Sequence, residues 1–472
     1  MRGDRRTEGD ACDVEPAGVR GSADVSQNVV ASLKLPPKVS GEKPSSGHMD
    51  EFGANFARFM MRCNAECGEL AEFNMGGQQT VLMSGPEAQE AFFKTLDLKL
   101  SRAAAYQATV PVFGKGVIFD APPDKMKVQL KIQVDALRYQ NMKNYSTVIS
   151  QEVEDWVASW GDEGELDFLD EFLRLTLHTA THCLLGKDFR DRMTEEFREL
   201  YHALEKGLQA IAFVDPYMQQ PVFEARDKAL VRLQALIGGI IAERRASSHI
   251  EYGDALETFM AGTYTDGSQL TENEITGLVI ATMFAGHHTS SGTATWTLTE
   301  LARQKEYSAE VSEELQALFK SGSEITLESL REIPKLEAFI EEVLRLHPPL
   351  VLLMRRVIED IEYNGTLIEA GKTVAISIYG SHRNTDYFPD PEKFDPYRPK
   401  PDTLFAYIPF GGGPHKCAGN AFAMMQMKAI FAALLPRYEF ELVDPDETYQ
   451  DDLSAIVLKP TGPCRLRYTK RK

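Results

Sequence analysis

The chain contains 472 residues, 43% of them hydrophobic, which is enough apolar surface to build a large core in one domain or a few. Its formal net charge of −19 argues against a nucleic-acid-binding protein, because such proteins need a basic face. The six cysteines are irregularly spaced and complete neither a paired metal-binding motif nor a secreted disulfide framework, so we expect a reducing, cytoplasmic location.

The first 46 residues differ in composition from the rest of the chain. Arg, Asp, Glu, Gly, Ser and Pro predominate there, so burial of apolar groups cannot offset the entropy cost of ordering. The most apolar piece, residues 29–33, is too short for a signal-peptide core or for the ~20 residues of a transmembrane helix. We therefore predict a disordered tail over residues 1–46, a single domain over residues 47–472 and no membrane anchor.

Hydrophobic periodicity predicts a mainly α-helical domain with small β-sheets. Residues 71–84 alternate around a Gly-Gly turn and predict a hairpin, whereas residues 360–409 indicate short strands and Pro-rich loops. The longest predicted helix, residues 271–303, begins at a capping box of Thr271 and Glu274 and is apolar almost throughout, which is typical of a helix inside a domain. Further helices are predicted over residues 123–145, 165–185, 194–213 and 222–245.

Basic side chains recur along the predicted helix 123–145 and around a glycine-rich loop near residue 415. If the two segments meet, they form a basic patch on an acidic protein, which would attract an acidic partner. For an isolated charge run, a solvated helix face is the more common explanation. The residues concerned are Lys125, Lys127, Lys131, Arg138 and Lys143 on the helix, and His415, Lys416 and Lys428 around the loop.

The run from Ala285 to Ser291 interrupts the long apolar helix with polar side chains. Small residues there let a flat cofactor or oxygen approach the backbone, and Thr289 can bond to a carbonyl one turn earlier and open the helix locally. Thr289 could then relay protons, with His288 as an upstream donor that titrates near neutral pH. The alternative is a helix kink with a satisfied core histidine.

Two further pairs of polar residues occur at helical spacing. Glu342 and Arg345 share one face of an apolar helix, so a buried ion pair is plausible there, and Arg398 is a candidate third member. His178 and His182 are four residues apart, but no glutamate base lies between them. A core or groove pair is therefore favoured over a zinc site.

The segment from Phe410 to Gly419 places a single cysteine, Cys417, in a glycine-rich loop that leads directly into an apolar helix. Glycines let backbone N–H groups approach the sulfur, and the following helix directs its positive end toward it. This arrangement favours a thiolate ligand of haem iron. An ordinary buried cysteine is the alternative, and a phosphate-binding loop is excluded because no Gly-Lys-Ser/Thr follows.

Together these motifs resemble the cytochrome P-450 superfamily from about residue 36 to the end of the chain. The resemblance implies a triangular, mainly helical haem domain and an oxidoreductase with haem b as cofactor. Cys417 would be the axial metal ligand, with Phe410, Gly411, Gly419 and Ala285 around the cofactor. The cysteine loop matches at Phe410, Gly413, His415, Cys417 and Gly419, and the other signatures match at Glu342, Arg345 and Arg398 and at Ala285, Gly286 and Thr289.

A narrower resemblance is to soluble bacterial sterol 14α-demethylases. It rests on the segment from Tyr106 to Asp120 and on the run Gly-His-His-Thr-Ser-Ser at residues 286–291. The likeness implies proton delivery by Thr289 and His288, with Glu205 as the ion-pair partner of His288. It assigns the haem propionates to Tyr106, Lys127, Arg355 and His415, and the substrate pocket to Phe113, Phe119, Thr109, Phe284, Leu350, Leu352 and Met354.

The implied reaction is the three-step, O2-dependent removal of the 14α-methyl group from lanosterol-type sterols. The family also implies a monomer, sensitivity to azole inhibitors and a separate electron donor, either ferredoxin with its reductase or a flavodoxin. Two departures bear on the ligands. Thr109 replaces a bulky apolar residue, and Met126 stands where relatives carry an arginine. The alternatives are a monooxygenase for another terpenoid or a fatty acid, and a haem-containing sterol or lipid carrier without turnover.

Overall fold

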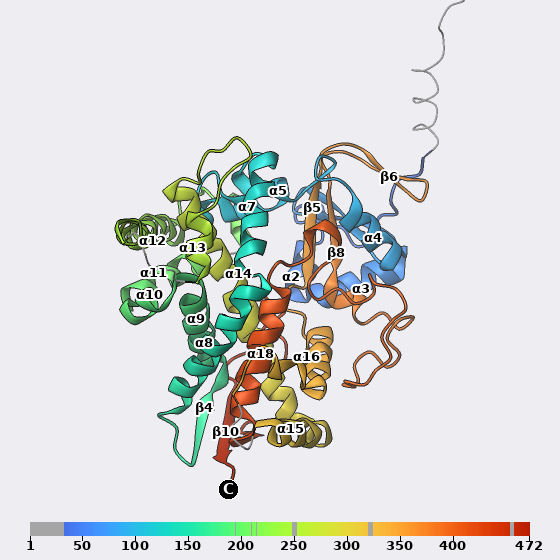
Figure 1. Ribbon diagram of the computed structural model, residues 1–472. Coiled ribbons are helices and arrows are strands. Elements are labelled where there is room, and N and C mark those ends of the chain that lie inside the picture. Colours follow the sequence, from blue (N-terminus) through green and yellow to red (C-terminus); the bar gives the residue numbers. More distant parts are fainter. Residues whose placement is uncertain are drawn as a thin grey trace, which may run out of the picture.

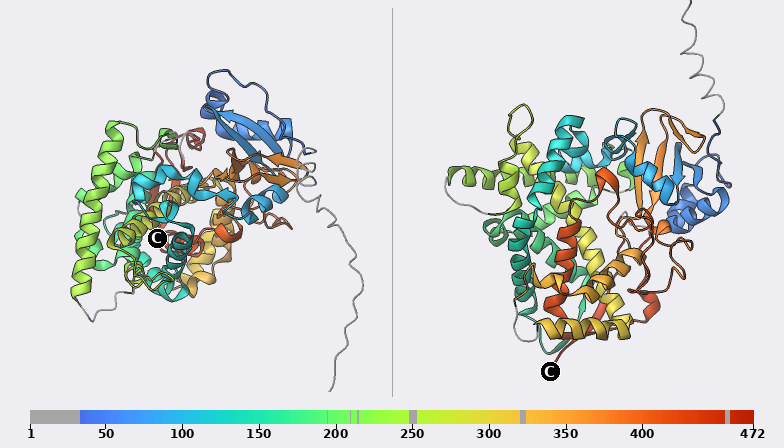
Figure 2. Two further views of the ribbon diagram at one scale, coloured as in Figure 1. Left: turned by 90° about the horizontal axis from the view of Figure 1, so that it is seen from above. Right: turned by 45° about the vertical axis from the view of Figure 1, so that its right-hand side comes forward.

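The computed structural model describes residues 33–193, 195–208, 210–213, 215–247, 253–319, 324–453 and 457–472 (Figure 1). Helices make up most of this structure, with small sheets at its right and lower edges in Figure 1, in agreement with the mainly helical domain with small sheets that the periodicity predicts. The view from above shows the long helix α12 (Pro221–Ala246) along one side of the molecule and the largest sheet at the other (Figure 2). Among the described residues, no helix combines the length and apolar character needed to cross a bilayer.

Helix α14 (Glu272–Arg303) runs through the middle of the molecule and is the longest helix described. The capping box predicted at its start is present: the Thr271 hydroxyl accepts from the Glu274 N–H, and the Glu274 carboxylate accepts from the Thr271 N–H at 2.7 Å. Several buried threonines within the helix donate to the carbonyl four residues earlier, as Thr293 does to Thr289 at 2.8 Å. These bonds satisfy hydroxyl groups that would otherwise be costly to bury.

Four helices packed around α14 build the core. They are α9 (Phe168–Leu185), α12, α16 (Pro334–Leu346) and α18 (Asn420–Leu434). The other helices described are α2 (Met49–Ala54), α3 (Phe56–Cys67), α4 (Pro86–Lys94), α5 (Arg102–Ala105), α6 (Val110–Phe113), α7 (Pro123–Ala136), α8 (Tyr139–Val157), α10 (Lys187–Arg192), α11 (Glu195–Lys206), α13 (Ala255–Met260), α15 (Lys305–Phe319) and α17 (Ile378–Ser381).

Three sheets flank these helices. The largest has the strand order β1 (Leu70–Met75), β2 (Gln78–Met83), β8 (Thr373–Ser377), β5 (Leu352–Val357) and β3 (Leu100–Ser101), with β2 and β8 parallel and the other pairs antiparallel. The β1–β2 pair is the predicted hairpin. The smaller sheets are β4 (Glu163–Asp167), β10 (Arg465–Lys470) and β9 (Tyr438–Leu442), and β6 (Ile361–Tyr363) with β7 (Thr366–Ile368).

Three predicted helices differ from the structure in their extent. The helix expected over 123–145 is two helices, because Arg138 adopts an extended conformation between α7 and α8. The helix expected from residue 165 begins at Phe168, where Asp167 caps it, since the preceding residues pair as β4. The helix expected over 194–213 ends at Lys206, just before Gly207, and a short 3-10 turn follows at Ala210–Phe213.

The expected tail boundary at residue 46 also differs from the structure. Lys34 forms a β-bridge with Thr366, and Lys38 forms one with Glu72. Val39 is 4% exposed, and its N–H donates to the Glu72 carbonyl at 2.8 Å. Backbone pairing and this apolar contact therefore order the chain from residue 33, and residues 1–32 of the predicted tail lie outside the described residues.

Candidate active site

The loop before α18 holds Cys417 in a defined backbone geometry. The Cys417 N–H donates to the Phe410 carbonyl at 2.8 Å and closes the loop. Gly413 has a φ of 61°, and a Cβ there would lie 3.0 Å from the Phe93 carbonyl oxygen, so this position requires glycine. A Cβ on Gly419 would instead lie 3.8 Å from the Cys417 sulfur, in ordinary contact with it.

Cys417 is the only one of the five cysteines in the described part of the chain that is exposed. Desolvation raises the pKa of its thiol, while the Gly419 N–H and the Lys416 charge lower it. A cationic metal and the positive end of α18 would both favour the thiolate. Cys464, by contrast, is buried against the Thr299 hydroxyl at 3.4 Å.

The middle of α14 carries the residues that the sequence predicts to act in oxygen activation. The Thr289 hydroxyl donates to the Ala285 carbonyl at 2.7 Å, which is the backbone bond expected from its position. Ala285 is exposed although most of α14 is buried, and a Cβ on Gly286 would meet nothing within 4 Å. A flat group can therefore approach the helix backbone closely along this face.

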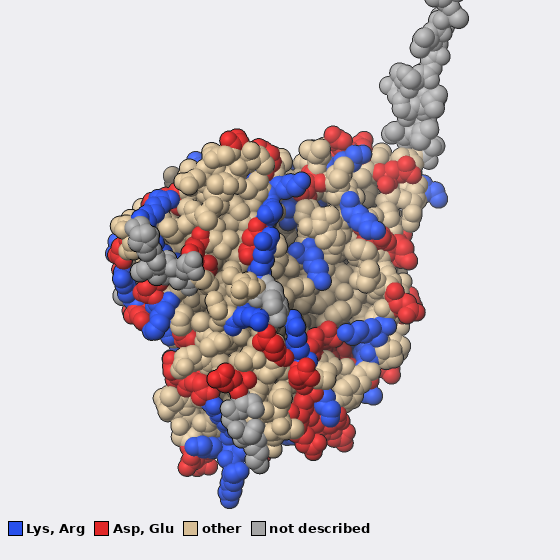
Figure 3. All heavy atoms as spheres, in the orientation of Figure 1, with Lys and Arg blue, Asp and Glu red and all other residues tan. Residues whose placement is uncertain are grey.

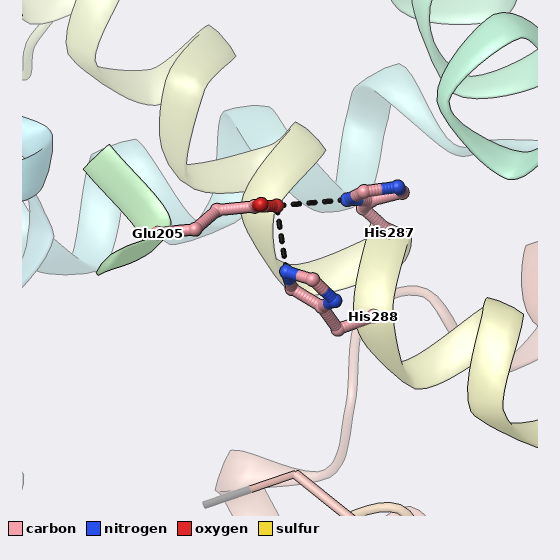
Figure 4. Close-up of side chains that lie close together, drawn as sticks. All are labelled: Glu205, His287 and His288. Atoms are coloured by element: carbon pink, nitrogen blue, oxygen red, sulfur yellow. Dashed lines mark hydrogen bonds and ion pairs between the residues drawn. The ribbon is translucent and has the colours of Figure 1, made fainter. Parts of the chain in front are cut away.

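Glu205 on α11 accepts from both adjacent histidines of α14 (Figure 4). One carboxylate oxygen lies 2.9 Å from His287 Nδ1 and 2.6 Å from His288 Nε2. Although burial acts in the opposite direction, the hydrogen bonds from these two histidines hold the pKa of Glu205 well below its usual range. Sequence reasoning paired Glu205 with His288 alone and missed His287, whose position next to His288 was the available signal.

A second group of residues concentrates positive charge near β5. Arg355 is 4% exposed, and its Nη1 donates to the Met354 carbonyl at 2.8 Å. Burial lowers the pKa of Arg355 to about 10. Arg102 lies close by, 3.8 Å from an Asp97 oxygen, and its Nε has no hydrogen-bond partner among the described residues. His415 Nε2 lies 2.8 Å from the other Asp97 oxygen.

This charge group fits the haem propionates. The half-buried Arg102 pairs with the partly exposed Asp97, and the buried Arg355 forms no ion pair among the described residues, although burying such charges is costly unless anions are supplied. Tyr106 lies beside them: its hydroxyl accepts from the Met354 N–H at 3.2 Å, so its own proton is free to donate. Arg102 was absent from the predicted set, whereas the predicted Lys127 is exposed on α7.

The predicted pocket residues lie on several elements around α14. The ring of Phe113 on α6 contacts that of Phe284 on α14 at 5.8 Å, and Tyr106 stacks on Phe119 at 5.4 Å. Thr109 is buried, and its hydroxyl donates to the Tyr106 carbonyl at 2.7 Å, so it does not add a free donor to the pocket. Leu352 and Met354 are half-buried on β5, and Leu350 is exposed just before it.

The comparisons with known proteins agree with these features. The family model described as Cytochrome P450 matches residues 37–466. The chain belongs to the cytochrome P450 family. It is therefore an oxidoreductase of the monooxygenase type with a haem-thiolate centre, and the predicted fold and enzyme class are confirmed.

Three relatives named as demethylases match nearly the whole chain. The protein "Sterol 14alpha-demethylase" of Mycolicibacterium vanbaalenii is 41% identical, covering 94% of this chain and 99% of that protein. Its namesake in Mycobacterium bovis is 43% identical, covering 92% of this chain and 98% of that one. The "Sterol 14-demethylase" of Arabidopsis thaliana is 36% identical, over 93% and 92% of the two chains. The predicted resemblance to this branch is thus confirmed.

A solved structure shows the same fold. A cyanobacterial CYP120A1 with bound retinoic acid aligns with a TM-score of 0.82 and 24% identity, covering 93% of this chain and all of that one.

The P450 signature pair Glu342 and Arg345 anchors the segment that leads to the cysteine loop. Two hydrogen bonds of 2.8 Å join the buried side chains, and Arg345 also donates to the His382 and Pro391 carbonyls. Arg398 Nε lies 3.5 Å from Glu342, so the structure brings the three residues together.

His382, which the sequence analysis did not single out, ties this anchor to the chain before the cysteine loop. One ring nitrogen contacts the Arg345 carbonyl at 3.2 Å, and the other accepts from the Ile408 N–H at 2.9 Å. Burial lowers the pKa of His382 to about 3, so the ring is neutral and bridges the two segments.

The basic patch predicted from α7, α8 and the cysteine loop is partly neutralised. Lys131 and Arg138 both pair with Asp135, and Lys428 is buried against Glu337 at 2.6 Å. Figure 3 shows Lys and Arg in a column near α7, with acidic side chains beside them. Lys125 is 3.7 Å from Glu274 and lies over the Tyr264 ring, whereas the neighbouring Met126 is buried.

Proposed function

We propose that this P450 removes the 14α-methyl group of lanosterol-type sterols. The observation that carries the proposal is identity of 41–43%, over nearly the full length, with bacterial proteins named sterol 14alpha-demethylase. In this reaction the methyl carbon leaves as formic acid and a 14–15 double bond forms. Three dioxygen molecules, six electrons and six protons are consumed, and four water molecules are released.

The residues present fit haem b as the cofactor. The Cys417 sulfur would bind the iron, while Arg102, Arg355, Tyr106 and His415 would hold the propionates. We also assign to this set Lys127, which is exposed on α7. When bound, the haem supplies oxygen activation, which thiolate ligation favours. The glycine-rich loop keeps the sulfur at one side of that cofactor, and the exposed Ala285 leaves room on α14.

Thr289, His288 and Glu205 form the proposed proton route. The Thr289 hydroxyl is held by the Ala285 carbonyl, so its lone pairs remain available to accept a proton from solvent or from a neighbour. His288 is 29% exposed and hydrogen-bonded to Glu205 at 2.6 Å, so this side chain of α14 meets both bulk water and the carboxylate. A single gated donor of this kind would supply protons slowly, one at a time.

The substrate would lie against the apolar side chains around α14. The edge-to-face contact between Phe113 and Phe284 brings α6 and α14 together and gives an apolar aromatic wall for a hydrophobic substrate. Because the Thr109 hydroxyl is already bonded to the Tyr106 carbonyl, the change from a bulky residue enlarges this region without adding a free donor. Leu352 and Met354 would contribute flexible apolar contacts from β5.

Electrons would come from a separate donor, a ferredoxin with its reductase or a flavodoxin. Lys416 is exposed next to Cys417, and an acidic donor would be attracted to that cation. We also propose a monomeric, cytoplasmic protein, since Cys63, Cys183 and Cys464 are buried as free thiols.

Reconstitution of the purified protein tests this function. A carbon monoxide difference spectrum establishes thiolate ligation, and titration with lanosterol then reports sterol binding through the shift from low-spin to high-spin iron. Turnover is measured with ferredoxin, ferredoxin reductase and NADPH, with a 14-desmethyl sterol as the matched control. We expect a spin shift and a 14–15 unsaturated product from lanosterol alone.

Two other results would overturn the proposal. Rapid reduction and oxygen uptake with no sterol product would indicate a monooxygenase for another hydrophobic substrate. Sterol binding without reduction by any donor, in protein that still binds carbon monoxide after chemical reduction, would indicate a carrier.

A further inference from the structure

Three histidines converge on the carboxylate of Glu205. One oxygen contacts His287 Nδ1 at 2.9 Å and His288 Nε2 at 2.6 Å (Figure 4). The other oxygen lies 3.4 Å from His202 Nδ1. His202 is one turn before Glu205 on α11, whereas His287 and His288 come from α14. Among the described residues, the ion pairs of Glu205 are with histidines only.

The ring of His287 is oriented by hydrogen bonds on both sides. Its Nε2 lies 2.9 Å from the Leu173 carbonyl, which can only accept, so Nε2 carries a proton. The opposite nitrogen, Nδ1, donates to the Glu205 carboxylate at 2.9 Å, and a bound ion would displace the proton between them. Histidines that bind metal ions are held in this way, with the distal N–H donated to a carbonyl and the free nitrogen directed at the ion.

We propose that Glu205, His287 and His288 bind a zinc ion, with a water molecule as the fourth ligand. The ligand atoms of the first three residues all lie within 4.8 Å of one another. Two imidazoles and one carboxylate are a common zinc ligand set, and small rotations of these side chains would provide the tetrahedral geometry that zinc adopts. The ion would take the place of the proton between each histidine and the carboxylate.

The surroundings of the cluster permit an ion to enter and to stay. The side chains of Glu205 and His287 are 10% and 6% exposed, whereas those of His288 and His202 are 29% and 62% exposed, so entry is from the His202 side. Tyr201 packs its ring 5.5 Å from that of His287, and burial raises the pKa of its hydroxyl, which therefore stays neutral. That hydroxyl has no hydrogen-bond partner among the described residues.

Zinc at this site would inhibit the enzyme. This consequence rests on the proposed function, because a histidine nitrogen that coordinates an ion cannot carry a proton toward Thr289. Binding itself requires no turnover, so it can be measured on its own.

The binding test uses haem-loaded protein that has been freed of metal by dialysis. Equilibrium dialysis against ZnCl2 at pH 7.5 should show one tight zinc per chain that Glu205→Gln and His288→Ala lose, with affinity weakened about 100-fold or more. His178→Ala is the matched control: this histidine lies on α9 against Arg190 at 2.9 Å, outside the cluster, and its loss should leave zinc binding unchanged. The carbon monoxide spectrum of each variant reports whether it has folded.

Identical zinc isotherms for the parent protein and the two folded cluster variants would overturn the site. In a separate arm, zinc should lower the product formed per NADPH oxidised in the parent protein and equally in His178→Ala, and removal of zinc with EDTA should restore that yield in both. If zinc binds through Glu205 but the yield per NADPH does not change, the inhibitory role is wrong while the site stands. Failure of sterol turnover in zinc-free parent protein would contradict the proposed function instead.

Discussion

At Arg345, every part of the guanidinium group has a partner inside the protein. Two bonds reach Glu342, and others reach the carbonyls of His382, Pro391 and Lys393. A charge pair this deeply buried contributes to stability only while both partners remain, because either ion alone would lack compensation.

Replacing Arg345 with Met should therefore lower the free energy of unfolding by about 3–5 kcal/mol, since it leaves the Glu342 carboxylate buried without its partner. Urea denaturation, followed by circular dichroism, measures this change. Lys187→Met removes one partner of the exposed pair with Asp191 and should cost less than about 1 kcal/mol. Similar losses of unfolding free energy in Arg345→Met and Lys187→Met would contradict the conclusion that burial makes the Glu342–Arg345 pair important.

Gly413 provides a second test at the level of a single residue. Alanine there would combine a φ of 61° with a Cβ only 3.0 Å from the Phe93 carbonyl, so the loop that presents Cys417 should shift. We expect Gly413→Ala to contain less haem per protein, measured by the pyridine haemochrome method.

Gly239→Ala is the control for Gly413→Ala. It lies within α12, where an added Cβ meets nothing within 4 Å, and alanine favours helix. Full haem content in Gly413→Ala would mean that the loop does not require this glycine.

At the level of elements, His347 joins α16, α14 and the chain near residue 451. Its ring stacks on Trp296 at 3.7 Å, with one nitrogen 2.7 Å from Asp451 and the other 3.8 Å from Glu300. Burial disfavours the charged ring, but the two carboxylates outweigh it and raise the pKa of His347 above its usual value. The two carboxylates therefore favour the protonated ring in the folded protein.

The raised pKa determines the sign of a pH effect on stability. The folded state holds the proton more tightly than the unfolded state, so the stabilisation is complete below about pH 6.5 and is lost as pH rises through the higher folded pKa. The stability difference between the parent protein and His347→Gln, measured by urea denaturation, should thus be largest at acidic pH and shrink toward alkaline pH.

His178 provides a control residue for which the pH dependence of stability runs in the opposite direction. Burial lowers its pKa to about 4, so its neutral ring becomes a penalty for folding as pH falls from about 6.5 toward that value. His178→Asn should therefore gain stability relative to the parent protein at low pH. If the difference in unfolding free energy between the parent protein and His347→Gln did not change with pH, the raised pKa of His347 would be wrong.

For the molecule as a whole, local sequence patterns predicted the elements better than their meeting points. The capping box at Thr271 and the Gly-Gly hairpin depend on neighbouring residues, so the sequence was sufficient for both. The break at Arg138 and the partners of Arg102 and His287 depend on contacts between distant segments. No local pattern indicates that Leu173 and Glu205 contact the two ring nitrogens of His287. The sequence analysis likewise did not predict the acidic partners of Lys131 and Lys428.

The most direct test of the central claim follows the methyl carbon. Lanosterol labelled with 13C at the 14α-methyl group is incubated with the enzyme, ferredoxin, ferredoxin reductase and NADPH, and the products are measured by mass spectrometry. We predict labelled formate and 14–15 unsaturated sterol in equal amounts. Consumption of oxygen and NADPH with the labelled methyl group still on the sterol would contradict demethylation.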